Sequence, residues 1–287
     1  MSTSTPSPIS TTDTVFVLVH GAWHSSAQWA RTQRALAELG ASSVAVDLPG
    51  HGLAAPLPSG YLDGDQPRLD TEPSALAGLS LNECAETILS TLRAVRRHRN
   101  VVLVAHSAGG APASLAAELA PELVDRMVYL SAFCPAGRPR FIDYLDAPEQ
   151  TDTARGRALS VGDAAALGAI RINPLSRDPE YVEELRLTHY TDTPAEEFDR
   201  WRLALSPDLP IAIPSTPVAL TRQRWGRIPR TFIRCAADLA STPAMQDLMI
   251  AEADSAVPDN PFTVRSMPGG HSPFAARPTE LATVLAR

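Results

Sequence analysis

Cysteine is scarce in this sequence, and its three copies lie far apart. Cys84, Cys134 and Cys235 show no C-x-x-C pairing. Disulfide-rich secreted domains and thiolate zinc sites both need paired or clustered cysteines, so neither class is expected. An odd and sparse set is typical of free thiols that pack as small hydrophobic groups in a reducing compartment.

Clusters of basic residues and long apolar runs are also missing. The formal net charge is -7, with acidic and basic residues scattered along the chain. Nucleic acids and anionic membranes both attract clustered Lys and Arg, so we expect neither as a main partner. No stretch approaches the ~20 apolar residues that a membrane-spanning helix needs.

The first residues lack the features of a signal peptide. Residues 1–13 are rich in Ser, Thr and Pro and have no basic start or apolar run, so they predict a disordered tail. The chain as a whole has 44% hydrophobic and 20% charged residues, an ordinary globular composition. We expect a soluble, cytoplasmic protein.

What the sequence does contain is an alternation of short β-branched runs and helical patterns. Buried-strand runs occur at 15–19, 44–48, 101–105, 127–133, 231–236 and 262–267, and helical patterns at 28–39, 80–99, 108–119, 244–253 and 279–285. This alternation predicts an α/β fold with a mostly parallel, doubly wound sheet. Residues 80–83 (SLNE) have the capping-box pattern of a helix start.

Two segments interrupt the alternation. Residues 53–79 are rich in Pro, Gly and Asp without periodicity, and predict a long surface loop. Residues 135–228 contain helical patterns at 181–187 and 195–205 but no convincing strand. They predict a helical cap inserted after the fourth strand, which leaves 14–134 and 229–287 as the core. Arginines of the cap, such as Arg171, are interpreted as ordinary exposed groups.

A serine lies at one strand-to-helix junction. Residues 105–110 read AHSAGG, between the run VVLVA and a small-residue helix. The nucleophile-elbow pattern G-x-S-x-G needs small residues on both sides of the serine, because the turn brings the strand and helix backbones together. Ala105 takes the place of the first glycine, and Ser107 is the predicted nucleophile. The alternative is a tight turn without chemistry.

An acid and a base should follow this serine in the order Ser, Asp, His. Asp238 comes after the penultimate strand, and His271 lies in a Pro/Gly-rich loop after the last one. We predict that His271 is the general base and that Asp238 orients it. The alternatives are a helix-terminal charge for Asp238 and an exposed loop residue for His271.

Acyl transfer also needs two N–H donors for the oxyanion. We expect them to be the backbone amides of Ala108 and of Ala22, in the loop HGAW at 20–23. His20 is interpreted as a structural histidine that pins this loop by hydrogen bonds. It is spaced H-x-x-x-H with His24, but without a further ligand this pattern predicts no metal site. No cofactor is expected either.

Together these motifs resemble a known family. The segments are 17–23 (VLVHGAW), 47–52 (DLPGHG), 104–110 (VAHSAGG) and 129–133 (YLSAF), with 224–230 (RWGRIPR) and 270–274 (GHSPF). The first four resemble the plant methylesterase and hydroxynitrile lyase branch of the α/β-hydrolase superfamily, and the last two its bacterial esterase members. The resemblance implies the α/β-hydrolase fold. The lyases carry Thr at the position of Gly21 and Lys at that of Ser272, so this chain favours ester hydrolysis.

The substrate pocket is the part that the sequence determines least. Trp23, His189, Tyr190 and Trp201 are candidates for its lining, with packing inside the cap as the alternative. The favoured function is a serine hydrolase that acts on a small-molecule carboxylic ester, such as a methyl ester or lactone, through an acyl-enzyme. A lyase, thioesterase or acyl-transfer enzyme with the same triad and a non-catalytic ligand-binding homologue are the alternatives. A homodimer is left open.

Overall fold

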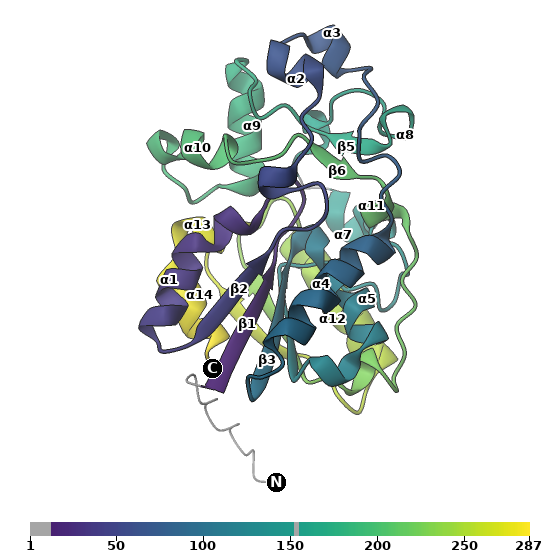
Figure 1. The fold of residues 1–287 in the computed structure, drawn as a ribbon, viewed down its shortest axis with the longest axis vertical. Coiled ribbons are helices and arrows are strands. Elements are labelled where there is room, and N and C mark those ends of the chain that lie inside the picture. Colours follow the sequence, from purple (N-terminus) through teal and green to yellow (C-terminus); the bar gives the residue numbers. More distant parts are fainter. Residues whose placement is uncertain (1–12, 152–154) are drawn as a thin grey trace.

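A parallel sheet forms the centre of the computed structural model, which describes residues 13–151 and 155–287. The six strands follow the order β2-β1-β3-β4-β7-β8, and each neighbouring pair is parallel (Figure 1). They are β1 (Thr14–Val19), β2 (Ser42–Val46), β3 (Asn100–His106), β4 (Arg126–Leu130), β7 (Arg230–Cys235) and β8 (Thr263–Met267). The predicted parallel α/β sheet is confirmed. Residues 1–12 of the predicted tail lie outside the described residues.

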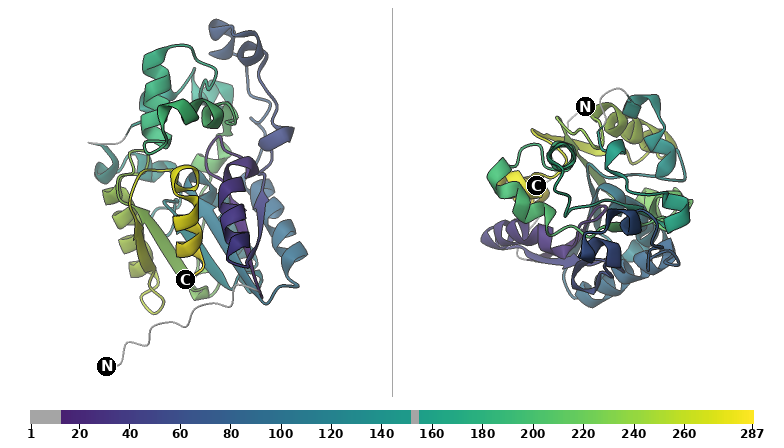
Figure 2. Two further views of the ribbon diagram at one scale, coloured as in Figure 1. Left: turned by 90° about the vertical axis from the view of Figure 1, so that its left-hand side faces the viewer. Right: turned by 90° about the horizontal axis from the view of Figure 1, so that it is seen from above.

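Helices cover both faces of this sheet because successive strand residues point to opposite sides. Helices α4 (Leu81–Val95), α5 (Gly110–Leu119) and α12 (Pro243–Ala256) cover one face, and α1 (Ala30–Glu38) and α14 (Pro278–Leu285) the other. Val17 and Leu103 belong to the core of the first face, and Phe16 and Val104 to that of the second. Figure 2 shows α1 and α14 side by side. Burial on both faces explains the uninterrupted apolar runs in the sequence.

The predicted capping box is present at the start of α4. The Ser80 amide donates to Glu83 Oε2 at 2.8 Å, and the Glu83 amide donates to Ser80 Oγ at 3.3 Å. These bonds satisfy two of the N–H groups that a helix start leaves without partners. None of the helices in the described residues is long and apolar enough to cross a membrane.

Between β4 and β7 the chain leaves the sheet, and most of this segment lies in the upper part of the molecule in Figure 1. Its helices are α6 (Ile142–Leu145), α7 (Pro148–Thr151), α8 (Ala164–Leu167), α9 (Pro179–His189), α10 (Ala195–Arg202) and α11 (Ala212–Ser215). The segment also contains a two-stranded antiparallel sheet of β5 (Ala169–Arg171) and β6 (Asp208–Pro210), which corrects the prediction that it has no strand. Each strand is only three residues long and carries polar residues or proline, so no apolar run marks it.

The prediction of one long surface loop at 53–79 is also wrong in part. This segment contains α2 (Ser59–Asp63) and α3 (Gln66–Leu69), which are five and four residues long. Helices of about one turn are too short to show periodicity in a sequence. The segment packs against the upper part of the molecule, where the Ser74 amide donates to the Leu167 carbonyl at 2.8 Å.

A buried ion pair joins this segment to the small sheet. Arg171 is fully buried, and its Nε and Nη2 donate to Asp208 Oδ1 and Oδ2 at 2.6 and 2.8 Å. Its Nη1 donates to the carbonyls of Leu69 and Glu72 at 2.7 and 2.8 Å. Arg171 is therefore not the exposed arginine expected from the sequence. It connects β5, β6 and the end of α3.

We expect Arg171→Met to lower the free energy of unfolding by about 3–5 kcal/mol, because it leaves the Asp208 carboxylate buried without its partner. Urea denaturation measures this change. Arg186→Met is the matched control, since Arg186 pairs with Glu183, whose side chain is exposed, and should cost about 0–1 kcal/mol. Equal losses in the two variants would contradict the structural role of Arg171.

Candidate active site

Ser107 lies at the turn between β3 and α5, where the short helix η4 (Ser107–Gly109) begins. Its φ of 51° is in the left-handed region, which costs a non-glycine residue about 1–3 kcal/mol. Strain of this kind is found at the nucleophile elbow of serine hydrolases. A Cβ atom at Gly109 would lie 2.2 Å from the His20 carbonyl oxygen, so the close approach of two backbones requires a glycine here.

The structure brings the three predicted triad residues together. His271 Nε2 lies 2.9 Å from Ser107 Oγ, and His271 Nδ1 lies 2.7 Å from Asp238 Oδ2. Both are hydrogen-bond distances, and all three side chains are buried. The residues follow β3, β7 and β8 respectively. The carboxyl ends of parallel strands therefore place residues up to 164 positions apart in one site.

The Asp238 carboxylate has a full set of hydrogen-bond donors. Its Oδ1 accepts the amides of Ala240 and Ser241 at 2.8 and 2.9 Å, and its Oδ2 accepts the Ser131 hydroxyl at 2.5 Å in addition to His271 Nδ1–H. Sequence reasoning assigned no role to Ser131. The feature of the sequence that could have indicated a role for Ser131 is its position, as a polar residue immediately after a central strand in the segment YLSAF.

The loop that carries His271 is held from two sides. His106 Nε2–H donates to the His271 carbonyl at 2.9 Å, and the Gly270 amide donates to Asp192 Oδ2 at 2.9 Å. Neither contact was predicted from the sequence. His106 neighbours Ser107 in the chain, yet its ring supports the backbone of the base and makes no hydrogen bond to the Ser107 hydroxyl.

The loop with the predicted oxyanion donor is fixed by His20. The Leu48 amide donates to His20 Nε2 at 3.1 Å, and His20 Nδ1–H donates to the Gly21 carbonyl at 2.8 Å. Ala22 borders the same cavity as Ser107. Ala108 is the second residue of η4, so its amide belongs to the first turn, where N–H groups have no intrahelical acceptor.

A cavity of about 460 Å³ opens over Ser107 and His271. Much of its wall is apolar and comes from Phe133, Phe141, Ile142, Leu145, Ile170 and Leu209. Of the four candidate lining residues, Trp23 and His189 border this cavity. Tyr190 and Trp201 do not: the Tyr190 hydroxyl donates to His24 Nε2 at 2.9 Å, and the Trp201 ring lies under the Arg31 guanidinium at 5.1 Å.

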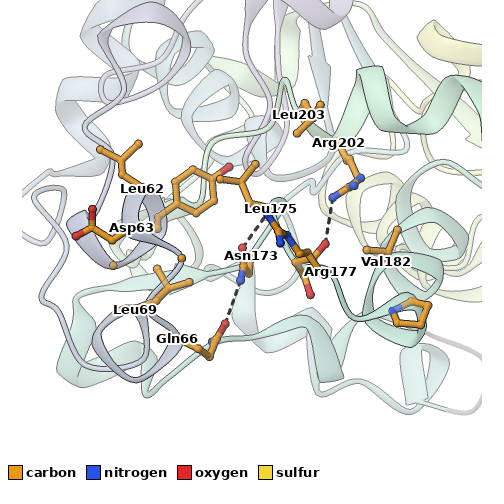
Figure 3. A pocket seen from close by; sticks show the side chains of 15 residues that line it. Leu62, Asp63, Gln66, Leu69, Asn173, Leu175, Arg177, Val182, Arg202 and Leu203 are labelled. Carbon is orange, nitrogen blue, oxygen red and sulfur yellow. Dashed lines mark hydrogen bonds between the residues drawn. The ribbon is translucent and has the colours of Figure 1, made fainter.

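A second cavity, of about 950 Å³, lies between α2–α3 and the helices α9 and α10 (Figure 3). Leu62 and Leu175 border it, together with Arg177 and Arg202. Arg202 already donates to the Pro174 carbonyl at 2.6 Å. None of the predicted triad residues borders this cavity, whereas Ser107 and His271 border the first one.

Comparison with known proteins identifies the family to which this chain belongs. A model of the alpha/beta hydrolase family matches residues 16–284. The chain therefore belongs to the alpha/beta hydrolase family. Within that family it is similar to plant methylesterases.

The curated relatives include the following two proteins of Arabidopsis thaliana. Methylesterase 7 is 26% identical over 284 residues, which cover 94% of this chain and 94% of the relative. Putative methylesterase 12, chloroplastic, is 24% identical and covers 94% of this chain and 70% of the relative.

Solved structures that share the fold include the following two. A pyrethroid hydrolase from Sphingobium faniae JZ-2 has a TM-score of 0.70 at 22% identity, with 95% of this chain and 96% of that chain covered. Polyneuridine aldehyde esterase has a TM-score of 0.69 at 20% identity, with 95% and 97% covered.

Proposed function

We propose that the protein is a serine hydrolase that cleaves a carboxylic ester of a small molecule through an acyl-enzyme on Ser107. The observation that carries this proposal is the hydrogen-bonded series from Ser107 Oγ through His271 to Asp238, at 2.9 and 2.7 Å, beside a cavity of about 460 Å³. The relatives named methylesterases and the esterase among the solved structures support it.

In the first half-reaction Ser107 Oγ attacks the ester carbonyl carbon while His271 Nε2 takes the hydroxyl proton. The carbonyl oxygen becomes an oxyanion, which the amides of Ala22 and Ala108 stabilise. Asp238 stabilises the imidazolium that forms. His271 then gives its proton to the leaving alkoxy oxygen, the C–O bond breaks, and the acyl group remains on Ser107.

In the second half-reaction a water molecule takes the place of the alcohol. His271 accepts a proton from this water as it attacks the acyl carbon, and the same two amides stabilise the second oxyanion. The proton returns to Ser107 Oγ as the acid leaves. The carboxylate of Asp238 keeps its charge throughout.

Two positions support hydrolysis over lyase chemistry. A Cβ atom at Gly21 would lie 2.7 Å from Ser107 Cβ and 2.8 Å from His106 Nδ1, so the threonine of the lyases does not fit without a backbone shift. Ser272 stands where the lyases carry lysine, and its Oγ is buried. No cation follows the base in the chain.

A p-nitrophenyl ester series from acetate to palmitate tests the proposal. We expect hydrolysis with a burst of p-nitrophenol equal to the enzyme concentration, because the acyl-enzyme accumulates. Since the cavity is small, kcat/KM should be higher for butyrate and hexanoate than for palmitate. A fluorophosphonate probe should label the protein. Absence of both turnover and labelling would contradict the proposal and favour a non-catalytic ligand-binding homologue.

A further inference from the structure

His189 is a polar ring beside the triad that the mechanism does not use. It is the last residue of α9 and is 8% exposed. Its ring centroid lies 5.7 Å from that of His271 and 5.5 Å from that of Trp23. It borders the same cavity as Ser107. The upper part of the molecule thus presents an imidazole directly to the reaction site.

This ring differs from the other buried histidines in its hydrogen bonds. Four of them each pair with a backbone carbonyl: His20 with that of Gly21, His24 with that of Ala22, His51 with that of Pro49 and His106 with that of His271. His189 Nδ1 is sealed from solvent and has no partner among the described residues, and Nε2 makes no hydrogen bond there either. A buried polar group without a partner is costly, so a ligand that supplied one would bind favourably.

The state of this ring follows from its surroundings. Burial lowers the pKa of His189 well below 6.5, with His271 and His24 as further causes, so the imidazole is neutral and carries one donor and one acceptor. Unpaired buried N–H groups are rarer than unpaired buried acceptors. The sealed Nδ1 is therefore assigned the lone pair and Nε2 the hydrogen. The ring then offers the cavity one N–H donor.

Most other polar groups around the cavity are already engaged. Gln150 donates to the Ala240 carbonyl and Arg157 to the Leu145 carbonyl. Arg155 and Thr188 both donate to the Glu184 carboxylate. The exceptions besides His189 are Ser160, whose exposed hydroxyl makes no hydrogen bond within the described residues, and Ser241, whose buried Oγ has no partner there. His189 is thus the unengaged donor that lies in ring contact with the base.

We propose that His189 Nε2–H donates a hydrogen bond to a substrate oxygen other than the scissile carbonyl, which makes His189 a specificity-determining residue. The substrates that it selects are esters with a hydroxyl or keto oxygen close to the ester group, over analogues with a methyl group in that place. This inference rests on the proposed ester hydrolysis. An analogue without the oxygen leaves the donor unpaired in an apolar cavity, and that loss reduces kcat/KM.

Two matched ester pairs test the inference on the full chain. They are methyl mandelate with methyl 2-phenylpropanoate, and methyl 3-hydroxybutanoate with methyl 3-methylbutanoate, in which a methyl group replaces the hydroxyl. We expect the wild type to prefer the hydroxy ester in at least one pair by between about 5-fold and 150-fold in kcat/KM. His189→Phe keeps an aromatic ring but has no N–H, and should bring this ratio close to 1. His189→Gln keeps an N–H donor and should restore part of the ratio.

Two further variants separate this role from its alternatives. His98→Phe makes the same replacement at His98, the one histidine of the chain that is not buried. This variant should keep the wild-type ratio. Ser241→Ala removes the other buried polar atom of the cavity wall that has no partner in the described residues, and should also keep the wild-type ratio. Three results would each overturn the inference. They are a wild type without any preference for the hydroxy ester, a His189→Phe variant with the wild-type kcat/KM ratio, and a Ser241→Ala variant that loses the preference. Failure of the wild type to hydrolyse any ester or to react with a fluorophosphonate would instead overturn the proposed function, and this inference with it.

Discussion

Ser107→Ala is expected to lower kcat for ester hydrolysis by a factor on the order of 10⁴–10⁶. Ser107 Oγ is the atom that lies 2.9 Å from His271 Nε2, and without it no acyl-enzyme forms. The oxyanion donors and the cavity stay in place, so a small residual rate over water is expected. Steady-state turnover of p-nitrophenyl butyrate measures the loss, and the pre-steady-state burst should disappear.

A control for this variant is Ser114→Ala. Ser114 is a fully buried serine on α5, and its Oγ lies 2.6 Å from the Tyr129 hydroxyl. Its loss should reduce stability while kcat stays within about threefold of the wild type, because surrounding groups still hold the triad. Turnover by Ser107→Ala close to that of Ser114→Ala would show that Ser107 is not the nucleophile.

The backbone at Ser107 adds a second readout. Alanine, like serine, is strained at a φ of 51°, whereas glycine is not. Ser107→Gly should therefore be as inactive as Ser107→Ala but more stable to urea, by about 1 kcal/mol. This comparison separates the strain at the elbow from the chemistry of the hydroxyl. Equal stability of the two variants would argue against strain.

The sequence predicts the sheet and the triad positions for a physical reason. Strands β1, β3 and β4 are buried on both faces, which demands continuous apolar runs that stand out in the sequence. The triad residues follow strands, so a prediction of strand order also places Ser107, Asp238 and His271 at one edge of the sheet. Their hydrogen-bonded geometry then follows from the fold.

The contacts that the sequence does not predict depend on pairings across the fold. Nothing in the sequence distinguishes Arg171 from a surface arginine, because its partner Asp208 lies 37 residues later and meets it only in the folded protein. His189 and Tyr190 are neighbours at one helix end, yet His189 borders the cavity and Tyr190 packs on His24. Which of two adjacent side chains faces the substrate depends on how α9 is docked. No pattern within the helix encodes that.

Asp238→Asn is expected to lower kcat by a factor on the order of 10⁴ while the fold is retained. The carboxylate of Asp238 accepts four hydrogen bonds, two on each oxygen. Asparagine has only one oxygen, and the two amide donors of Ala240 and Ser241 at Oδ1 oblige it to stay there. The NH₂ group must then face His271 Nδ1 and the Ser131 hydroxyl. It donates to Nδ1, which moves the imidazole proton to Nε2, and Nε2 can no longer accept the proton of Ser107.

The loss of activity in Asp238→Asn is expected to come from the wrong imidazole tautomer and not from a displaced side chain, and the two causes can be distinguished by measurement. Asp238→Asn should still bind a substrate-like inhibitor with an affinity near that of the wild type, because the cavity is unchanged, while kcat falls. Asp247→Asn is the matched control: Asp247 pairs with Arg234, its side chain is exposed, and kcat should stay near the wild-type value. A loss of less than tenfold in Asp238→Asn would contradict the role of Asp238.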